Sequence, residues 1–212
     1  MDIEYVRPSE IEKRSFEIIT KELQDRGIVL DENNAPVIKR CIHTTADFDY
    51  ADTLVFSNDA INVFKSLIQN GAVIVTDTNM ALSGINKKEL SKYGCEIHCY
   101  MADEDIANEA AKRGVTRASV SMERAMTLNK PVIFVIGNAP TALMTIREHY
   151  DMGYVPAFVV GVPVGFVNVE AAKELIINSD IDHIVNRGRK GGSNVAAAIC
   201  NAVLYMMRDN IL

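Results

Sequence analysis

The stretch PVIFVIGNAPT, residues 131–141, joins five consecutive apolar residues to a loop that contains Gly, Asn and Pro. A short apolar run bounded by such residues is typical of a β-strand that is covered on both faces. Helices must then pack on both sides of the sheet that contains it. The sequence therefore predicts a buried strand, followed by a loop at its carboxyl end.

Further β-rich runs lie on both sides of this stretch. AVIVT at 72–76 and PAFVVGVP at 156–163 are almost as apolar, and TLVF at 53–56 and CEIHCY at 95–100 are shorter. Helical patterns separate the runs, and this alternation is typical of a parallel sheet. We expect an α/β fold, with three α/β/α layers around a mainly parallel central sheet, similar to the Rossmann arrangement.

Two helices have clear boundary signals. Residues 9–26 form an amphipathic pattern that begins after Pro8 and ends before Gly27, and residues 193–210 carry an apolar stripe behind a Ser cap. The sequence contains no internal repeat or linker, and 48% of its residues are hydrophobic. We expect a single domain over residues 1–212.

Composition excludes several classes of protein. The net charge of −6 disfavours binding to nucleic acid or to an anionic membrane surface. No apolar run approaches the roughly 20 residues that span a bilayer, and the N-terminal residues lack the order of a signal peptide. The four cysteines do not form a zinc-binding pair motif. We expect a cytoplasmic protein with reduced thiols.

In parallel α/β sheets, ligands bind beyond the carboxyl ends of the strands, so the loops there are candidates for the site. Four such loops are distinctive in this sequence. They cover residues 77–84, 137–141, 161–168 and 187–194. The loop at 161–168 begins Gly-Val-Pro-Val-Gly, but the chain lacks both the Gly-x-Gly-x-x-Gly fingerprint and a Walker lysine. Nucleotide binding is therefore disfavoured.

The last loop, RGRKGGSN, combines Arg187, Arg189 and Lys190 with two glycines before a helix. Cationic side chains and helix N–H groups together favour a carboxylate or phosphate ligand. A solvated basic turn next to an ordinary helix cap explains the same residues. Arg117 and Arg124, seven residues apart, share a helix face, and solvated charges are their simpler interpretation.

His43 is the candidate acid. If the helix around it continues, Asp47 lies one turn further on and supports the imidazole, and a histidine can donate a proton near neutral pH. On spacing alone, a histidine at a helix end that forms local hydrogen bonds is the simpler interpretation. His183 lies in a charged context and is expected at the surface.

Five segments, in order along nearly the whole chain, resemble the precorrin-8X methylmutase family, including its cobalt-precorrin-8 branch. The segments are RSFEII (14–19), IHTTADFDYAD (42–52), GNAPTAL (137–143), GVPVGFVNVEAAKE (161–174) and GRKGGSNVAAAICNA (188–202).

This resemblance implies an isomerase of cobalamin biosynthesis that moves a methyl group from C11 to C12 of a tetrapyrrole polycarboxylate. It implies no cofactor, since any cobalt arrives within the substrate, and a homodimer whose active site lies near the subunit contact. His43 matches the histidine that protonates the macrocycle, and Arg117 matches an arginine of the substrate site. The segment Thr44–Asp47 favours the cobalt branch over the metal-free one.

Motif and loop position extend the expected substrate site beyond these two residues. The added positions are Arg14, Ser15, Thr44, Ser83, Gly84 and Asn138, with Arg189 and Lys190 added from their charge alone and Met80, Leu82 and Phe166 as apolar walls. Two alternatives stay open: a corrinoid carrier without catalysis, and a nucleotide-dependent oxidoreductase, which the missing phosphate fingerprint disfavours. Whether His43 donates a proton or polarises the ring by a hydrogen bond is also open.

Overall fold

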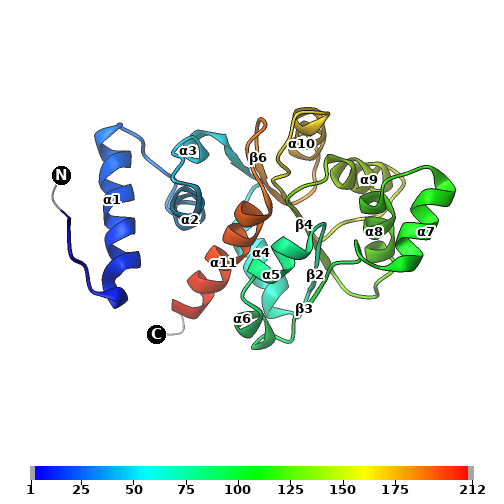
Figure 1. Cartoon of the computed structure of the whole chain (residues 1–212), viewed down its shortest axis with the longest axis horizontal. Coiled ribbons are helices and arrows are strands. Elements are labelled where there is room, and N and C mark those ends of the chain that lie inside the picture. The colour runs from blue at the N-terminus through cyan, green and yellow to red at the C-terminus, as the bar shows by residue number, and fades with distance from the viewer. Residues whose placement is uncertain (1–2, 210–212) are drawn as a thin grey trace.

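The computed structural model describes residues 3–209, and Figure 1 shows the arrangement of its helices and strands. Six strands form one sheet in the order β1-β6-β5-β4-β2-β3, and each neighbouring pair is parallel except β1 with β6. The strands are β1 (Leu54–Phe56), β2 (Val73–Thr76), β3 (Glu96–His98), β4 (Val132–Ile136), β5 (Phe158–Gly161) and β6 (His183–Asn186). The predicted mainly parallel sheet is confirmed.

Helices connect the strands and flank the sheet. A 3₁₀ turn at Pro8–Glu10 precedes α1 (Ile11–Asp25), α2 (Ala35–Thr45), α3 (Tyr50–Thr53), α4 (Ala60–Gln69), α5 (Asn79–Gly84), α6 (Lys87–Ser91), α7 (Glu104–Arg113), α8 (Arg117–Met126), α9 (Pro140–Asp151), α10 (Val169–Ile177) and α11 (Ser193–Asp209). The expected N-terminal and C-terminal helices correspond to α1 and α11. The expected last residue of the second, Asn210, lies outside the described residues.

The side chains of β4 show why three layers form. Ile133 and Val135 point into the cluster beneath α2, α4 and α11, whereas Val132, Phe134 and Ile136 point into the cluster beneath α8, α9 and α10. All five are almost completely buried. Each such side chain contributes about 1.5–3 kcal/mol when it leaves water, so both faces of the sheet require cover. The predicted α/β/α arrangement is confirmed.

The strand β6 was not predicted, because its sequence HIVN is short and only its two central residues are apolar. It is a strand because it lies between β5 and β1 and pairs with both. His183 is only 4% exposed there, and its Nδ1 lies 2.7 Å from the carbonyl oxygen of Ile181. Burial lowers the pKa of His183. The prediction of a surface position for this histidine was therefore wrong.

The sheet changes its direction of growth between β2 and β4. β3 is added on the outer side of β2, whereas β4, β5 and β6 follow on its other side. The loops after β2 and β4 therefore diverge to opposite faces, and ligands of open α/β sheets bind at such a point. Within residues 3–209, no helix combines the length and apolar character needed to cross a membrane.

Gly137, at the end of β4, allows the loop to approach α11. A Cβ atom at this position would lie 2.7 Å from Ser193 Cα and 2.9 Å from Ser193 N, so the backbone of α11 would have to move. At Gly94, where φ is +67°, an added Cβ atom would have no neighbour within 4 Å. Alanine there costs only the strain of the left-handed backbone.

We predict that Gly137→Ala lowers the free energy of unfolding by about 3 kcal/mol, because it overpacks a backbone contact. Gly94→Ala is the matched control and should lose only about 1 kcal/mol. Urea denaturation measures both values. Equal losses for the two variants would show that the contact with α11 is not tight.

Candidate functional site

Asp77 follows β2 directly and joins the carboxyl ends of β2 and β4. Its buried carboxylate accepts hydrogen bonds from the N–H groups of Gly137 (2.8 Å), Asn138 (2.8 Å) and Ala139 (2.6 Å). Burial raises the pKa of Asp77, and the three N–H groups oppose that rise by stabilising the carboxylate. The loop between β4 and α9 is therefore shaped around one buried acid.

Thr78, the residue after Asp77, connects the loop after β2 to α11. Its Oγ1 accepts a hydrogen bond from Ala81 N, which caps α5, and lies 2.7 Å from Ser193 Oγ. Ser193 is the first helical residue of α11, and Ala196 N donates to the carbonyl of Gly192. The hydroxyl expected to cap α11 thus binds the neighbouring loop.

Ser83, Gly84 and Asn138 follow the strands β2 and β4 in sequence, but at different distances from the strand ends. The expected loop at 77–84 is a short loop followed by α5, which exposes Ser83 and Gly84. Asn201 Nδ2 of α11 donates to the carbonyl oxygen of Gly84 at 2.9 Å. Asn138 is exposed, while its backbone is held by Asp77. Asn138 is therefore at the carboxyl edge, whereas Ser83 and Gly84 lie further along, beside the middle of α11.

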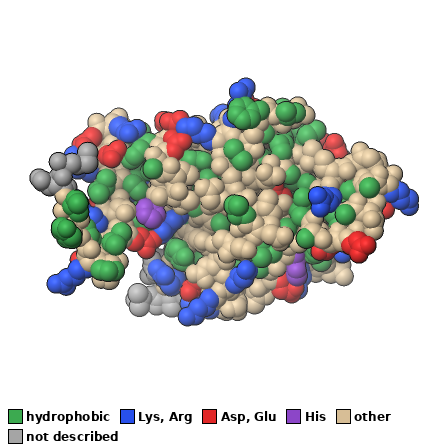
Figure 2. All heavy atoms as spheres, viewed as in Figure 1, with side chains coloured by type: hydrophobic (Ala, Val, Ile, Leu, Met, Phe, Trp, Pro, Cys, Tyr) green, Lys and Arg blue, Asp and Glu red, His purple; other side chains and the backbone are tan. Residues whose placement is uncertain are grey.

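His43 occupies the last turn of α2 and is exposed. Its ring stacks on Phe16 of α1, with centroids 5.2 Å apart and planes 25° apart. Thr44 is also exposed, and its hydroxyl donates to the carbonyl of Arg40 at 2.9 Å. In Figure 2 a histidine side chain is visible at the surface over α2, next to side chains of both charges. The imidazole is thus oriented from one side and open to a ligand.

The predicted support of His43 by Asp47 is wrong. Helix α2 ends at Thr45, because Ala46 adopts a left-handed conformation with φ of 55°. Asp47 therefore does not lie one helical turn beyond His43. Its Oδ2 lies 2.6 Å from Lys190 Nζ instead.

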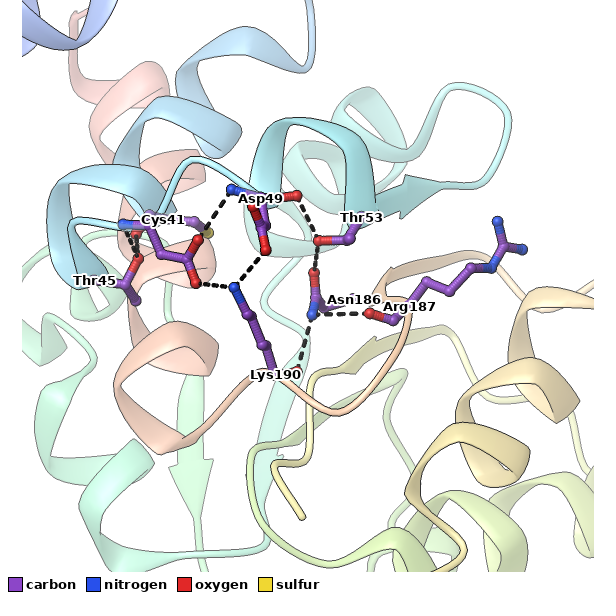
Figure 3. A network of polar contacts seen from close by, with 8 residues as sticks. Cys41, Thr45, Asp49, Thr53, Asn186, Arg187 and Lys190 are labelled. Carbon is purple, nitrogen blue, oxygen red and sulfur yellow. Dashed lines mark hydrogen bonds and ion pairs between the residues drawn. The ribbon is translucent and has the colours of Figure 1, made fainter. Parts of the chain in front are cut away.

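The basic loop after β6 meets the acids of the turn between α2 and α3. Lys190 Nζ lies between Asp47 Oδ2 at 2.6 Å and Asp49 Oδ2 at 2.5 Å, as Figure 3 shows for the labelled Lys190 and Asp49. The hydrogen bond from Lys190 lowers the pKa of Asp47. The loop thus carries one cation that is shared by two carboxylates.

Arg189 points to another neighbour. Its Nε lies 2.6 Å from Glu170 Oε1, and its guanidinium lies 5.7 Å from the centroid of the Phe166 ring. Phe166 is 83% exposed. An exposed ion pair contributes only about 0–1 kcal/mol, so a ligand carboxylate can replace Glu170 at little cost.

Arg14 and Ser15 directly precede Phe16 on α1. Arg14 Nε lies 2.8 Å from Glu4 Oε1, and Ser15 Oγ donates to the carbonyl of Ile11 at 2.9 Å. The ring of Phe16 stacks on the ring of His43, so Arg14 and Ser15 belong to the helical segment next to the histidine. Arg14, like Arg189, is held by an exposed carboxylate that a ligand can displace.

Arg117 lies apart from the other expected residues. It begins α8, is exposed, and its Nη1 lies 3.4 Å from the carbonyl oxygen of Met101. Figure 1 shows α8 and α2 on opposite sides of the molecule. One chain does not bring Arg117 to His43. Arg124, on the same helix, forms an exposed ion pair with Asp105, in agreement with its interpretation as a solvated charge.

Three polar residues that shape the edge were not recognised in the sequence: Asp77, Lys173 and Asn186. An acid directly after a buried apolar strand is a signal that could have identified Asp77. Lys173 and Asn186 are fully buried, and each binds the backbone of the loop after β6. No local pattern distinguishes that lysine from a surface lysine of an amphipathic helix.

The expected site residues offer several kinds of group to a ligand. They include an exposed imidazole, exchangeable arginines, polar groups and the exposed apolar side chains of Met80 and Phe166, while Leu82 is half-buried. Within residues 3–209, no group of three or more His, Cys, Asp or Glu side chains is placed to hold a metal ion. The exposed imidazole and arginines can supply proton donation and charge pairing.

Comparison with known proteins gives consistent relatives. The family model described as Precorrin-8X methylmutase matches residues 10–206. The cobalt-precorrin-8 methylmutase of Salmonella typhimurium is 43% identical over 96% of this chain and 97% of its own, and the precorrin-8X methylmutase of Pseudomonas aeruginosa is 34% identical over 95% and 97%. The solved structure of a precorrin-8x methyl mutase from Thermus thermophilus superposes with a TM-score of 0.86, at 34% identity over 96% of this chain and 100% of that one.

We predict that Asp77→Asn lowers the free energy of unfolding by about 3 kcal/mol, because an amide cannot accept from all three N–H groups and leaves buried donors without a partner. Asp103→Asn, at the start of α7 where the side chain makes no capping bond, is the control and should change stability by about 0.5 kcal/mol or less. Urea denaturation compares the two. A loss for Asp77→Asn as small as that of the control would contradict the role of the carboxylate.

Proposed function

Because the chain belongs to the precorrin-8X methylmutase family, which comprises isomerases of cobalamin biosynthesis, we propose that it moves a methyl group from C11 to C12 of cobalt-precorrin-8 and so forms cobyrinate. The names of most of its relatives support the cobalt form of the substrate. The observation that carries the assignment of the site is the exposed imidazole of His43, stacked on Phe16 near the basic loop.

The reaction balances within the substrate. The bond between C11 and the methyl carbon breaks, the bond between C12 and the same carbon forms, and no oxidant, reductant or second substrate is needed. We therefore propose that the chain uses no cofactor of its own and that cobalt enters as part of the substrate. His43 would donate a proton or a hydrogen bond to the macrocycle, which draws electron density along the conjugated ring as the methyl group moves.

Exchange of ion pairs would bind the substrate carboxylates. Arg14 and Arg189 now bind surface acids, and substrate carboxylates would replace those partners. Hydroxyl, amide and backbone groups of the expected site residues would bind the remaining carboxylates, and the apolar residues would contact the faces of the ring. These groups belong to Ser15, Thr44, Ser83, Gly84 and Asn138, with Met80, Leu82 and Phe166 as the apolar contacts.

A homodimer would complete this site. Arg117, which the family resemblance assigns to the substrate site, lies on the opposite side of the chain from the helix that carries His43. A two-fold axis can place the Arg117 of one subunit next to the His43 of the other. We propose that the cytoplasmic form of the protein is such a dimer. The alternative is a corrinoid carrier, which would bind the same ligand without turnover.

We predict that the wild type converts cobalt-precorrin-8, whereas His43→Ala binds it and loses turnover by a factor on the order of a thousand, as expected when a general acid is removed. The visible spectrum follows the change in conjugation, and metal-free precorrin-8 is tested in parallel. Conversion of the metal-free substrate alone would contradict the cobalt assignment. Binding without any spectral change in the wild type would favour the carrier.

We also predict that an equal mixture of the inactive variants His43→Ala and Arg117→Ala, assembled by co-expression, recovers about a quarter of the wild-type activity, since half of the dimers carry one intact site of two. Each variant expressed alone is the control. If the mixture is no more active than the two variants alone, His43 and Arg117 do not act across a subunit contact.

A further inference from the structure

The ammonium group of Lys190 is already satisfied by two acids of a different segment. Asp47 and Asp49 belong to the turn between α2 and α3, and both carboxylates lie within 2.6 Å of Lys190 Nζ. The two hydrogen bonds raise the pKa of Lys190 above its ordinary value. Two carboxylates therefore compete with any anionic ligand for this one ammonium group.

The backbone of Lys190 is held as firmly from the interior. Its carbonyl oxygen accepts hydrogen bonds from Lys173 Nζ at 2.8 Å and from Asn186 Nδ2 at 2.9 Å, and both donors are fully buried. Lys173 also donates to the carbonyl of Gly188 at 2.6 Å. Burial lowers the pKa of Lys173 to about 8, so most of its amine is still protonated at pH 7. The loop therefore has a fixed position relative to β6 and α10.

A second connection joins α3 to β6, beside the first. Thr53 Oγ1 lies 2.7 Å from Asn186 Oδ1 and 2.8 Å from the carbonyl oxygen of Asp49, and its hydrogen can serve either acceptor. Figure 3 shows Thr53, Asn186 and Lys190 as one continuous set of contacts between the loop and α3. The turn after α2 is thus attached through Lys190 to the loop after β6, and the helix that follows the turn is attached through Thr53 to β6 itself.

The same turn ends the helix that carries His43. Thr45 Oγ1 donates to the carbonyl of Cys41 at 2.8 Å and accepts from Asp47 N at 3.3 Å, and Asp49 N donates to Asp47 Oδ1 at 3.0 Å. These hydrogen bonds connect Asp47 to Thr45, in the last turn of α2. His43 lies in that turn, two residues before the helix ends.

We propose that Lys190 is a positioning residue for His43: held from the interior by its carbonyl and from the turn by its ammonium, it keeps the last turn of α2 at a fixed distance from the sheet edge. The proposal rests on the proposed function in assigning catalysis to His43. It gives Lys190 a role different from the charge-based expectation of a substrate ligand. A displacement of about 1 Å at a catalytic group can lower a rate by on the order of a hundredfold, so such a contact matters for turnover.

The decisive variant is Asp47→Asn with Asp49→Asn, which frees the charge of Lys190. The local bond from Asp49 N to the side-chain oxygen of residue 47 can still form. If Lys190 positions His43, kcat falls about tenfold or more, while the affinity for the product changes less than about threefold. If Lys190 is a substrate ligand, kcat stays at the wild-type value and product affinity stays equal or increases, which would overturn the proposal.

Adding Lys190→Met to that double variant provides the second comparison. Both sides of the contact are then absent, so the triple variant should lose no further activity and should bind the product as the double variant does. A further loss of product affinity of about tenfold or more would identify Lys190 as a ligand and contradict its positioning role. Lys190→Met alone would leave two acids without their cation, whereas the triple variant removes both the acids and the cation.

The matched control is a similar ion pair at the opposite edge of the sheet. Lys130 Nζ lies 2.6 Å from Glu96 Oε1, and the Lys130 side chain is 49% exposed against 48% for Lys190. Glu96→Gln and Lys130→Met should leave kcat and product affinity unchanged.

A measurement without substrate separates the two proposals. Hydrogen exchange of the amides at 45–50 and the ring resonances of His43 should change in the Asp47→Asn, Asp49→Asn variant and not in the controls. Unchanged exchange and resonances would overturn the positioning role whatever the activity. If the wild type converts neither form of precorrin-8, the proposed function fails, and the exchange and the His43 resonances still decide whether Lys190 holds this turn.

Discussion

The buried carboxylate of Asp77 is the constraint on which the carboxyl edge depends. A charge inside a protein is tolerated only where donors replace water, and here three consecutive N–H groups do so. Those groups belong to the loop between β4 and α9, so the acid determines where α9 begins. It also holds Gly137 against the first residue of α11, where no side chain would fit. One acid after β2 thus fixes the relation among two strands and two helices.

Lys173 is a buried cation that holds a second loop in a similar way. It too is completely buried, and it too binds backbone groups, namely the carbonyls of Gly188 and Lys190. Neither residue is free to meet a ligand, so both of these buried charges shape loops. The exposed arginines differ in kind: Arg14 and Arg189 hold surface acids through pairs that contribute little to stability. Rigid loops and exchangeable charges suit the binding of a polycarboxylate.

His43 stands at the boundary between the rigid sheet and the peripheral helices. The helix that carries it packs on α11 through Val37, Ile38 and Cys41, which are buried. Its last turn has two further supports, the stacked ring of Phe16 and the turn bound by Lys190. An acid that must approach a large macrocycle needs an open side, and these supports leave one. Exposure and orientation are therefore both available to the same imidazole.

The layers could be predicted from the sequence, because apolar runs such as 131–137 and amphipathic patterns such as 9–26 are set by local periodicity. The motif that contains His43 could be recognised because it is a contiguous string of residues that resembles the family. Pairing across the chain could not: β6 is a strand only because β5 and β1 lie beside it. The partner of Asp47 is Lys190, 143 residues away, and not the imidazole four residues before it. Spacing along a helix predicts a contact only while the helix continues, and the left-handed Ala46 ends it, so only the tertiary structure could decide which charges meet.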